Sequence, residues 1–159
     1  MTVKISYELI GLGWCWCIIS IDSVCRGMRG SYLSNILFDF YTAVINLLKG
    51  SEFESFSFPE EPGEYLWQIR KISSEKVSIK VTMFRSTPYR RKPEDIGEVI
   101  FDETSGLHDF ALAFNQSMDD LLSIWCLNGY KKKWNAHCFP LGKYEELREL
   151  LKSLPNKIS

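Results

Sequence analysis

The hydrophobic and polar positions of residues 31–50, SYLSNILFDFYTAVINLLKG, follow the period of a helix. Apolar residues recur every three or four positions, which places them on one helical face: Leu33, Ile36, Leu37, Phe40, Val44, Leu47 and Leu48. Polar residues form one narrow stripe, so we expect other parts of the chain to cover most of this helix. Ser31 is the predicted N-cap, and Gly50 is the predicted left-handed residue after the helix.

Two β-prone runs, residues 3–9 and 14–21, precede this helix and flank a glycine-containing turn, so they predict a hairpin. The second run, WCWCIISI, is apolar at both alternating sets of positions. Such a strand is either covered on both faces or exposes aromatic residues on one face to a partner. The following segment, SVCRGMRG, predicts a loop in which Arg26 and Arg29 are solvated charges, with anion binding as the alternative.

Beyond Gly50 the hydrophobic pattern changes to a period of two. Residues 53–58 predict a short strand, and the sequence PEEPG that follows predicts a turn. Residues 64–72 and 76–85 alternate apolar and polar side chains, so they predict antiparallel strands with one dry and one wet face. We expect the dry face to receive the central helix and a final strand to span residues 96–101.

Helical spacing returns in the last third of the chain. A second helix is predicted from a cap at Thr104 or Ser105 to a stop at Asn128-Gly129, and residues 141–154 predict a third, more charged helix. The predicted order is ββαββββαα. This order describes one α+β domain over residues 1–159, with three helices packed on an antiparallel sheet of about six strands.

The composition of the chain indicates its cellular location and its classes of partner, but it does not indicate a reaction. The net charge of −1 and the pI of about 6.1 give no overall field that would attract nucleic acid or anionic lipid. The most apolar run, residues 9–21, is too short to span a bilayer and lacks a signal-peptide cleavage site, which predicts a cytoplasmic protein without a membrane partner. The odd number of cysteines, five, predicts free thiols.

The sequence lacks the patterns that are typical of enzyme sites: a nucleophile with its base, a metal cluster or a glycine-rich phosphate loop. His108 is interpreted as a neutral surface residue. A zinc site that combines Cys15 and Cys17 with His137 and Cys138 is disfavoured, because the usual ligand spacing is missing. We therefore expect no catalytic residue, no cofactor and no metal, with an uncatalogued small enzyme as an alternative.

Basic residues with aromatic neighbours raise a second alternative. Residues 85–92 and 130–134 combine lysine or arginine with tyrosine or tryptophan, a mixture suited to stacking on bases and contacting phosphates. The balanced total charge and the absence of a nucleic-acid module motif argue against this use. A nucleic-acid-associated domain is thus an alternative and not the main hypothesis.

The run of residues 31–50, followed by FSFPEEPGEYLWQI and VSIKV, resembles a group of small bacterial α+β proteins. In these proteins a central helix ends in glycine, and a proline-glycine turn opens a strand that carries tyrosine and tryptophan. Some proteins of this style are immunity proteins of contact-dependent or polymorphic toxin systems. The resemblance covers residues 31–81, carries over no catalytic residue, and implies a cytoplasmic protein that neutralises a cognate toxin domain by occluding its active site.

A binding protein of this kind uses aromatic and arginine anchors, while charged residues set its partner choice. The predicted toxin-binding residues lie on the wet sheet face and in the flanking loops: Gln68, Arg70, Lys80, Thr82, Glu60, Glu61, Arg90 and Arg91. The sequence assigns neither the toxin nor an oligomeric state.

Overall fold

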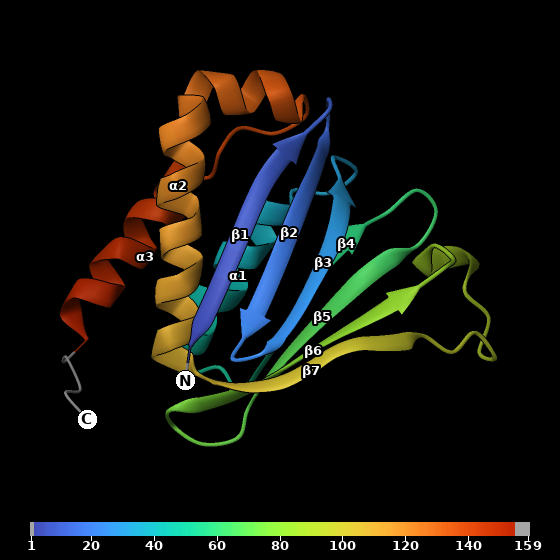
Figure 1. Cartoon of the computed structure of the whole chain (residues 1–159), viewed down its shortest axis with the longest axis horizontal. Helices are drawn as coiled ribbons and strands as arrows, with labels where there is room; N and C mark the ends of the chain where they lie inside the picture. The colour runs from blue at the N-terminus through green and yellow to red at the C-terminus, as the bar shows by residue number, and fades with distance from the viewer. Residues whose placement is uncertain (1, 155–159) are drawn as a thin grey trace.

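The structure, a computed structural model, describes residues 2–154 (Figure 1). Its elements are β1 (Val3–Ile10), β2 (Trp14–Ile21), β3 (Val24–Ser31), α1 (Ile36–Leu48), β4 (Phe53–Pro59), β5 (Glu64–Lys71), β6 (Lys76–Phe84), η1 (Pro88–Arg90), β7 (Glu98–Gly106), α2 (Leu107–Trp134) and α3 (Leu141–Ser153). The predicted α+β class, with helices packed against antiparallel strands, is confirmed.

The strands form two sheets instead of one. β1, β2 and β3 make sheet A, and β4, β5, β6 and β7 make sheet B, each in sequence order. The additional strand is β3, where the sequence predicted a loop. It pairs with β2 from Ile21↔Val24 to Trp14↔Ser31. The two glycines and two arginines of this segment have low strand propensity, so the local sequence did not predict a strand. The segment is a strand because β2 supplies the partners for its backbone hydrogen bonds.

The central helix α1 is shorter than predicted at its start. Ser31 is buried and ends β3, so the N-cap falls to Asn35, whose side chain accepts a hydrogen bond from the backbone N–H of Phe38 at 3.4 Å. Gly50 has a φ of 116°, in agreement with its predicted role after the helix.

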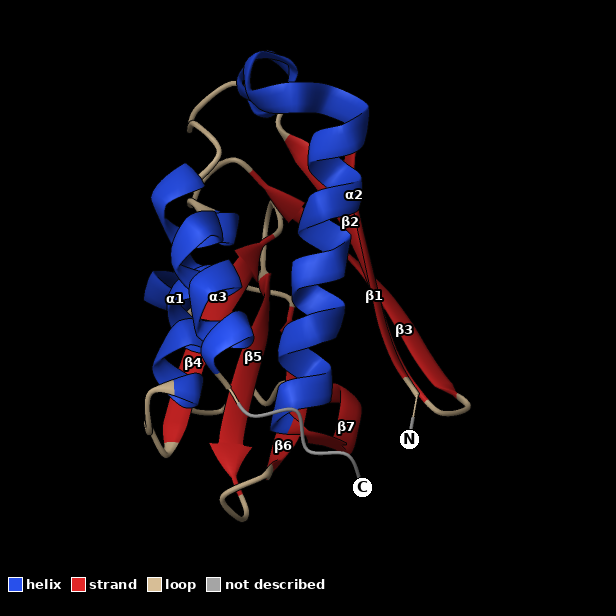
Figure 2. Cartoon of the chain, turned by 90° about the vertical axis from the view of Figure 1, so that its left-hand side faces the viewer, coloured by secondary structure: helices blue, strands red, loops and turns tan. Residues whose placement is uncertain are grey.

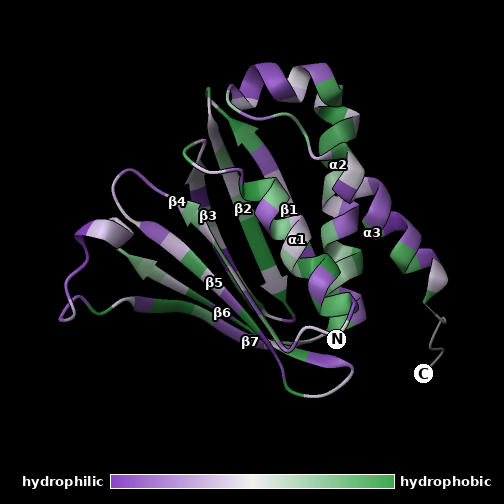
Figure 3. Ribbon diagram, turned by 180° about the vertical axis from the view of Figure 1, so that it is seen from behind, coloured by the Kyte–Doolittle hydropathy of each residue, from purple (hydrophilic) through white to green (hydrophobic). Residues whose placement is uncertain are grey.

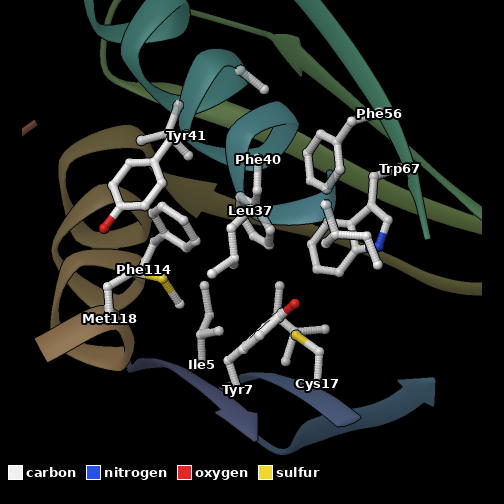
Figure 4. Packing of buried hydrophobic residues seen from close by; sticks show 14 of the residues in the cluster. Ile5, Tyr7, Cys17, Leu37, Phe40, Tyr41, Phe56, Trp67, Phe114 and Met118 are labelled. Atoms are coloured by element: carbon white, nitrogen blue, oxygen red, sulfur yellow. The ribbon is translucent and has the colours of Figure 1, made fainter. Parts of the chain in front are cut away.

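The core lies where α1 meets both sheets and α2 (Figure 4). Phe40 of α1 is at its centre, with its ring centroid 4.1 Å from that of Phe114 and 5.1 Å from that of Trp67. The predicted dry face of β5 and β6 is buried: Trp67, Ile69, Val77, Ile79 and Val81. This face receives α1, as the alternation predicted.

The long helix α2 runs alongside β1 and flanks that edge of sheet A (Figure 2). It bends at Cys126, which has φ of 55° and ψ of 178°, and then continues past the predicted stop at Asn128-Gly129. Tyr130 and Trp134, four residues apart, are both buried, and their packing stabilises this last segment. The helix ends at Asn135, which is left-handed with φ of 78°.

Polar contacts dock α3 on the other helices. The Tyr144 hydroxyl donates to Asp119 Oδ1 of α2 at 2.6 Å, and Lys49 Nζ lies 2.7 Å from Glu146 Oε1. Residues 2–154 contain no helix with the length and apolar character needed to cross a membrane.

Candidate protein-binding surface

The outer face of sheet A carries a partly exposed apolar surface. Along β2, Cys15, Cys17, Ile19 and Ile21 point into the core, whereas Trp14, Trp16 and Ile18 alternate with them and are half-buried on the outside. β2 is largely hydrophobic along its length (Figure 3). No coloured helix or loop lies in front of this face in Figure 1. Of the two interpretations of WCWCIISI, neither fits completely: the aromatic residues lie on an outer face, where they are half-buried.

The apolar surface continues beyond β2. We call it the tryptophan strip and define it by four residues: Ile10, Trp14, Trp16 and Ile18. Ile10 is the cross-strand partner of Trp14, so the two side chains share the outer face. Ile10 is 36% exposed, and the adjoining β1–β2 turn exposes Leu12, at 62%. The Tyr32 ring packs against Gly13 of this turn and is 40% exposed. Neighbouring apolar side chains at a surface are candidates for contact with a partner.

Backbone contacts hold the end of the strip in place. The Gly13 N–H donates to the Lys133 carbonyl of α2 at 2.9 Å, and the Tyr32 N–H donates to the Gly13 carbonyl at 2.9 Å. Gly13 has φ of 77°, a conformation that favours glycine. The turn that leads into Trp14 is therefore preorganised by α2.

One predicted partner residue, Glu60, belongs to the border of this strip. Arg29 on β3 lies 5.3 Å from the ring centroid of Trp14, and its Nη2 is 2.7 Å from Glu60 Oε1. Burial, followed by the Glu60 carboxylate, raises the pKa of Tyr65. Glu60 is thus an intramolecular partner of Arg29 and not a free loop charge, while Glu61 is exposed in the same turn.

The outer face of sheet B brings three predicted residues together. Gln68 and Lys80 are cross-strand partners, and Asp102 of β7 lies opposite Lys80. Arg70 lies on the same face, with its guanidinium carbon 4.6 Å from the ring centroid of Phe53. The predicted wet face is therefore one surface, and its use for partner binding remains a prediction.

Thr82 does not have the exposure that the alternation predicted. Thr82 is only 8% exposed, because Gly97 packs against it. A Cβ built at Gly97 would lie 2.4 Å from Thr82 Cγ2. The register between β6 and β7 also shifts between Val81 and Thr82. Thr82 is thus unsuited to direct contact with a partner in this conformation.

Arg91 is an anchor and not a free loop charge. Its Nη2 lies 2.6 Å from Glu64 Oε1, and its guanidinium carbon lies 3.5 Å from the ring centroid of Phe84. Ser57 Oγ donates to the other Glu64 oxygen at 2.6 Å. This half-buried cluster holds the loop of residues 85–97, which we call the arm. Arg90 is exposed on the arm, as predicted.

The arm displays apolar as well as charged side chains. Tyr89 is 85% exposed and Ile96 is 92% exposed. Beside the arm lies an open hollow of about 470 Å³, lined by Met83, Phe84, Arg85, Ser86, Glu94, Asp95, Ile96 and Glu98. Asp95 accepts from the Lys92 N–H at 2.9 Å, so this carboxylate shapes the loop itself.

Burial keeps the ionisable thiols and the tyrosine hydroxyl of the core in their protonated forms. Burial raises the pKa of the Cys15 thiol to about 12, and it raises the pKa values of Cys17 and Tyr7 well above their ordinary values. Within the described part of the chain, no group of three or more His, Cys, Asp or Glu residues is placed to hold a metal ion.

Comparisons with known proteins assign no family. No protein-family model matches the chain, and no curated protein or solved structure gives a significant match. The class is therefore defined by the structure itself: an α+β protein whose smaller sheet carries half-buried tryptophans on its outer face. Sequence reasoning did not select the strip as the site, although the W-C-W alternation in β2 is the signal that could have done so.

Proposed function

We propose that this protein is a non-catalytic immunity protein, which binds a cognate bacterial toxin domain and occludes its active site. The observation that carries the binding role is the tryptophan strip. Tryptophan, tyrosine and arginine are the residues that most often dominate the energy of protein interfaces. The strip contains Trp14 and Trp16, and Arg29 lies beside Trp14.

The strip is suited to a stable interface because its anchors are already positioned. Trp16 lies over Gly27, Trp14 lies beside Arg29, and the turn before Trp14 is hydrogen-bonded to α2. Side chains and loops that are ordered before binding lose less conformational entropy on association. The toxin as the partner follows from the resemblance of residues 31–81 to immunity proteins.

A protein partner fits the charges better than a nucleic acid does. Arg29 is paired with Glu60, and Glu8 lies on the same outer face as the strip, opposite Trp16. The arm carries exposed Arg90 beside Tyr89, but Glu94 and Glu98 follow a few residues later. Nucleic-acid sites are instead dominated by unpaired lysine and arginine that neutralise phosphates.

The test uses the toxin domain encoded beside this chain. We expect the purified domain to form a stable complex with the chain and to lose its toxicity when the two are coexpressed. Replacing Trp14 and Trp16 with serine should weaken binding by at least about 30-fold, the scale of an interface hot spot. Binding can be measured by calorimetry.

The matched control is Ile72→Ala, which removes a 55% exposed apolar side chain from the β5–β6 turn, far from the strip in sequence. This variant should bind like the wild type. Absence of a complex would reject the proposed function. A complex that tolerates both tryptophan substitutions would reject the strip as its binding surface.

A further inference from the structure

Sheet A has one edge flanked by a helix and one edge strand without a second strand partner. α2 runs alongside β1, whereas β3 pairs only with β2 in the strand order. Val24 is 37% exposed, and Cys25 and Arg26 are exposed. Unpaired edge strands present backbone donors and acceptors to which another strand can be added.

Hairpin geometry identifies the unpaired backbone groups. Two residues separate the closing pair Ile21↔Val24, and in such a hairpin this pair exchanges both backbone hydrogen bonds. The N–H and C=O groups of Cys25 and Gly27 therefore point away from β2. Within residues 2–154, neither residue has a backbone hydrogen bond to any other element. Their spacing of two residues matches the repeat of a strand.

The side chains of β3 leave this edge accessible. Arg26 turns under the sheet, where its Nε donates to the Ile100 carbonyl of β7 at 2.8 Å. Gly27 has no side chain, and the Trp16 indole covers it from the outer face. Arg29, further along, is held by Glu60. Charged side chains on an edge strand can block the addition of another strand. Here both arginines of β3 are bound to other parts of the chain, so they do not block the backbone of this edge.

Apolar side chains lie on both faces of sheet A at the place where an added strand would run. Trp16 lies on the outer face. Val24 is the cross-strand partner of Ile21, which points into the core, so Val24 lies on the inner face, and it is 37% exposed. A strand has alternating side chains, so it can contact both faces at once. A helix could cover the apolar groups but could not pair with the edge amides.

We infer that the partner adds an extended strand to β3, which enlarges sheet A to four strands. Its backbone pairs with Cys25 and Gly27, and its alternate apolar side chains contact Trp16 on one face and Val24 on the other. This inference rests on the proposed function, because the strand belongs to the toxin domain. The added strand lies beside the tryptophan strip, and the partner therefore approaches from the β3 edge of sheet A.

The first test is amide hydrogen exchange by NMR on the free chain and on its complex with the toxin domain encoded beside it. We expect the Cys25 and Gly27 amides to exchange at least about tenfold more slowly in the complex. A complex without this protection would overturn the inference and leave the proposed function intact. Protection that appears in the concentrated free chain would show self-pairing and would also overturn it.

The second test compares two substitutions at one residue. Cys25→Pro removes an N–H that is not bonded to β2, so the hairpin should keep its fold, whereas Cys25→Ser keeps the N–H. We expect the proline variant to bind the toxin domain at least about tenfold more weakly and the serine variant to bind like the wild type. Equal binding by both variants overturns the inference. Absence of any complex with the wild type overturns the proposed function and this inference together.

Discussion

The indole of Trp16 lies directly over the backbone of Gly27 on the neighbouring strand. A Cβ built at Gly27 would come within 2.3 Å of Cζ2 of that ring. The position of Trp16 on the outer face of sheet A therefore depends on a glycine in β3. Glycine is unfavourable inside a strand, but its missing side chain lets the Trp16 ring lie close to the sheet.

Gly27→Ala should displace the Trp16 ring into solvent. Because this ring is half-buried and can swing outward, we expect a modest loss of about 1 kcal/mol in the free energy of unfolding. Tryptophan emission should shift to longer wavelength. The control is Gly142→Ala in α3, where a Cβ meets nothing within 4 Å. That variant should be as stable as the wild type or more stable, by up to about 1 kcal/mol. Unchanged emission in Gly27→Ala would contradict the packing.

Glu64→Gln should destabilise the fold by roughly 2 kcal/mol, because it leaves the half-buried Arg91 guanidinium without its carboxylate. The side chains of Arg91 and Glu64 are 20% and 9% exposed. Urea unfolding measures the effect. Glu149→Gln is the control, since the pair of Glu149 and Lys152 is 3.6 Å apart and well exposed. A double cycle with Arg91→Gln that shows no coupling would contradict the anchoring role of Arg91.

Phe40→Ala should cost about 3 to 5 kcal/mol, the usual range for removing a fully buried phenylalanine. Phe40 is 0% exposed and packs against rings from β4, β5 and α2. Phe38→Ala, two residues earlier on the same helix, removes a ring that is 43% exposed and should cost far less. Similar midpoints of chemical unfolding for the two variants would contradict this arrangement of α1.

The cysteines should divide sharply by reactivity. Iodoacetamide should label Cys25, Cys126 and Cys138 in the native protein, since these thiols are exposed, and should reach Cys15 and Cys17 only after unfolding. Mass spectrometry of the native and denatured protein distinguishes the two groups. Rapid native labelling of Cys15 would show that the inner face of β2 is accessible.

Stability should fall as the pH rises above 9. Burial raises the folded-state pKa of Cys15 from 9.0 to about 12, so the unfolded chain releases this proton first and binds fewer protons in that range. The loss should approach about 1.4 kcal/mol per pH unit for each such thiol. Urea unfolding between pH 8 and 10.5 measures the slope. A double variant, Cys15→Ala with Cys17→Ala, should have a smaller slope; an unchanged slope would contradict burial of these thiols.

The pattern of the chain was sufficient for the elements that are governed by their own periodicity. The alternation in residues 64–85 predicted which face of β5 and β6 is buried, and helical spacing predicted that Phe40 faces inward. It also placed Gln68, Arg70 and Lys80 on one outer face. These features depend on local geometry, because a period of two or 3.6 residues determines which side chains share a face.

Only the tertiary structure decided which neighbours those faces and charges meet. β3 is a strand because β2 pairs with it, and Thr82 is buried because Gly97 packs against it. Glu60 and Arg91 were predicted to be free loop charges, but each is paired with a residue distant in sequence. Glu60 pairs with Arg29, 31 residues away, and Arg91 pairs with Glu64, 27 residues away. The physical reason is that a repeat in the sequence encodes the direction of a side chain, whereas pairing, burial and charge neutralisation arise from long-range contacts that exist only once the chain has folded.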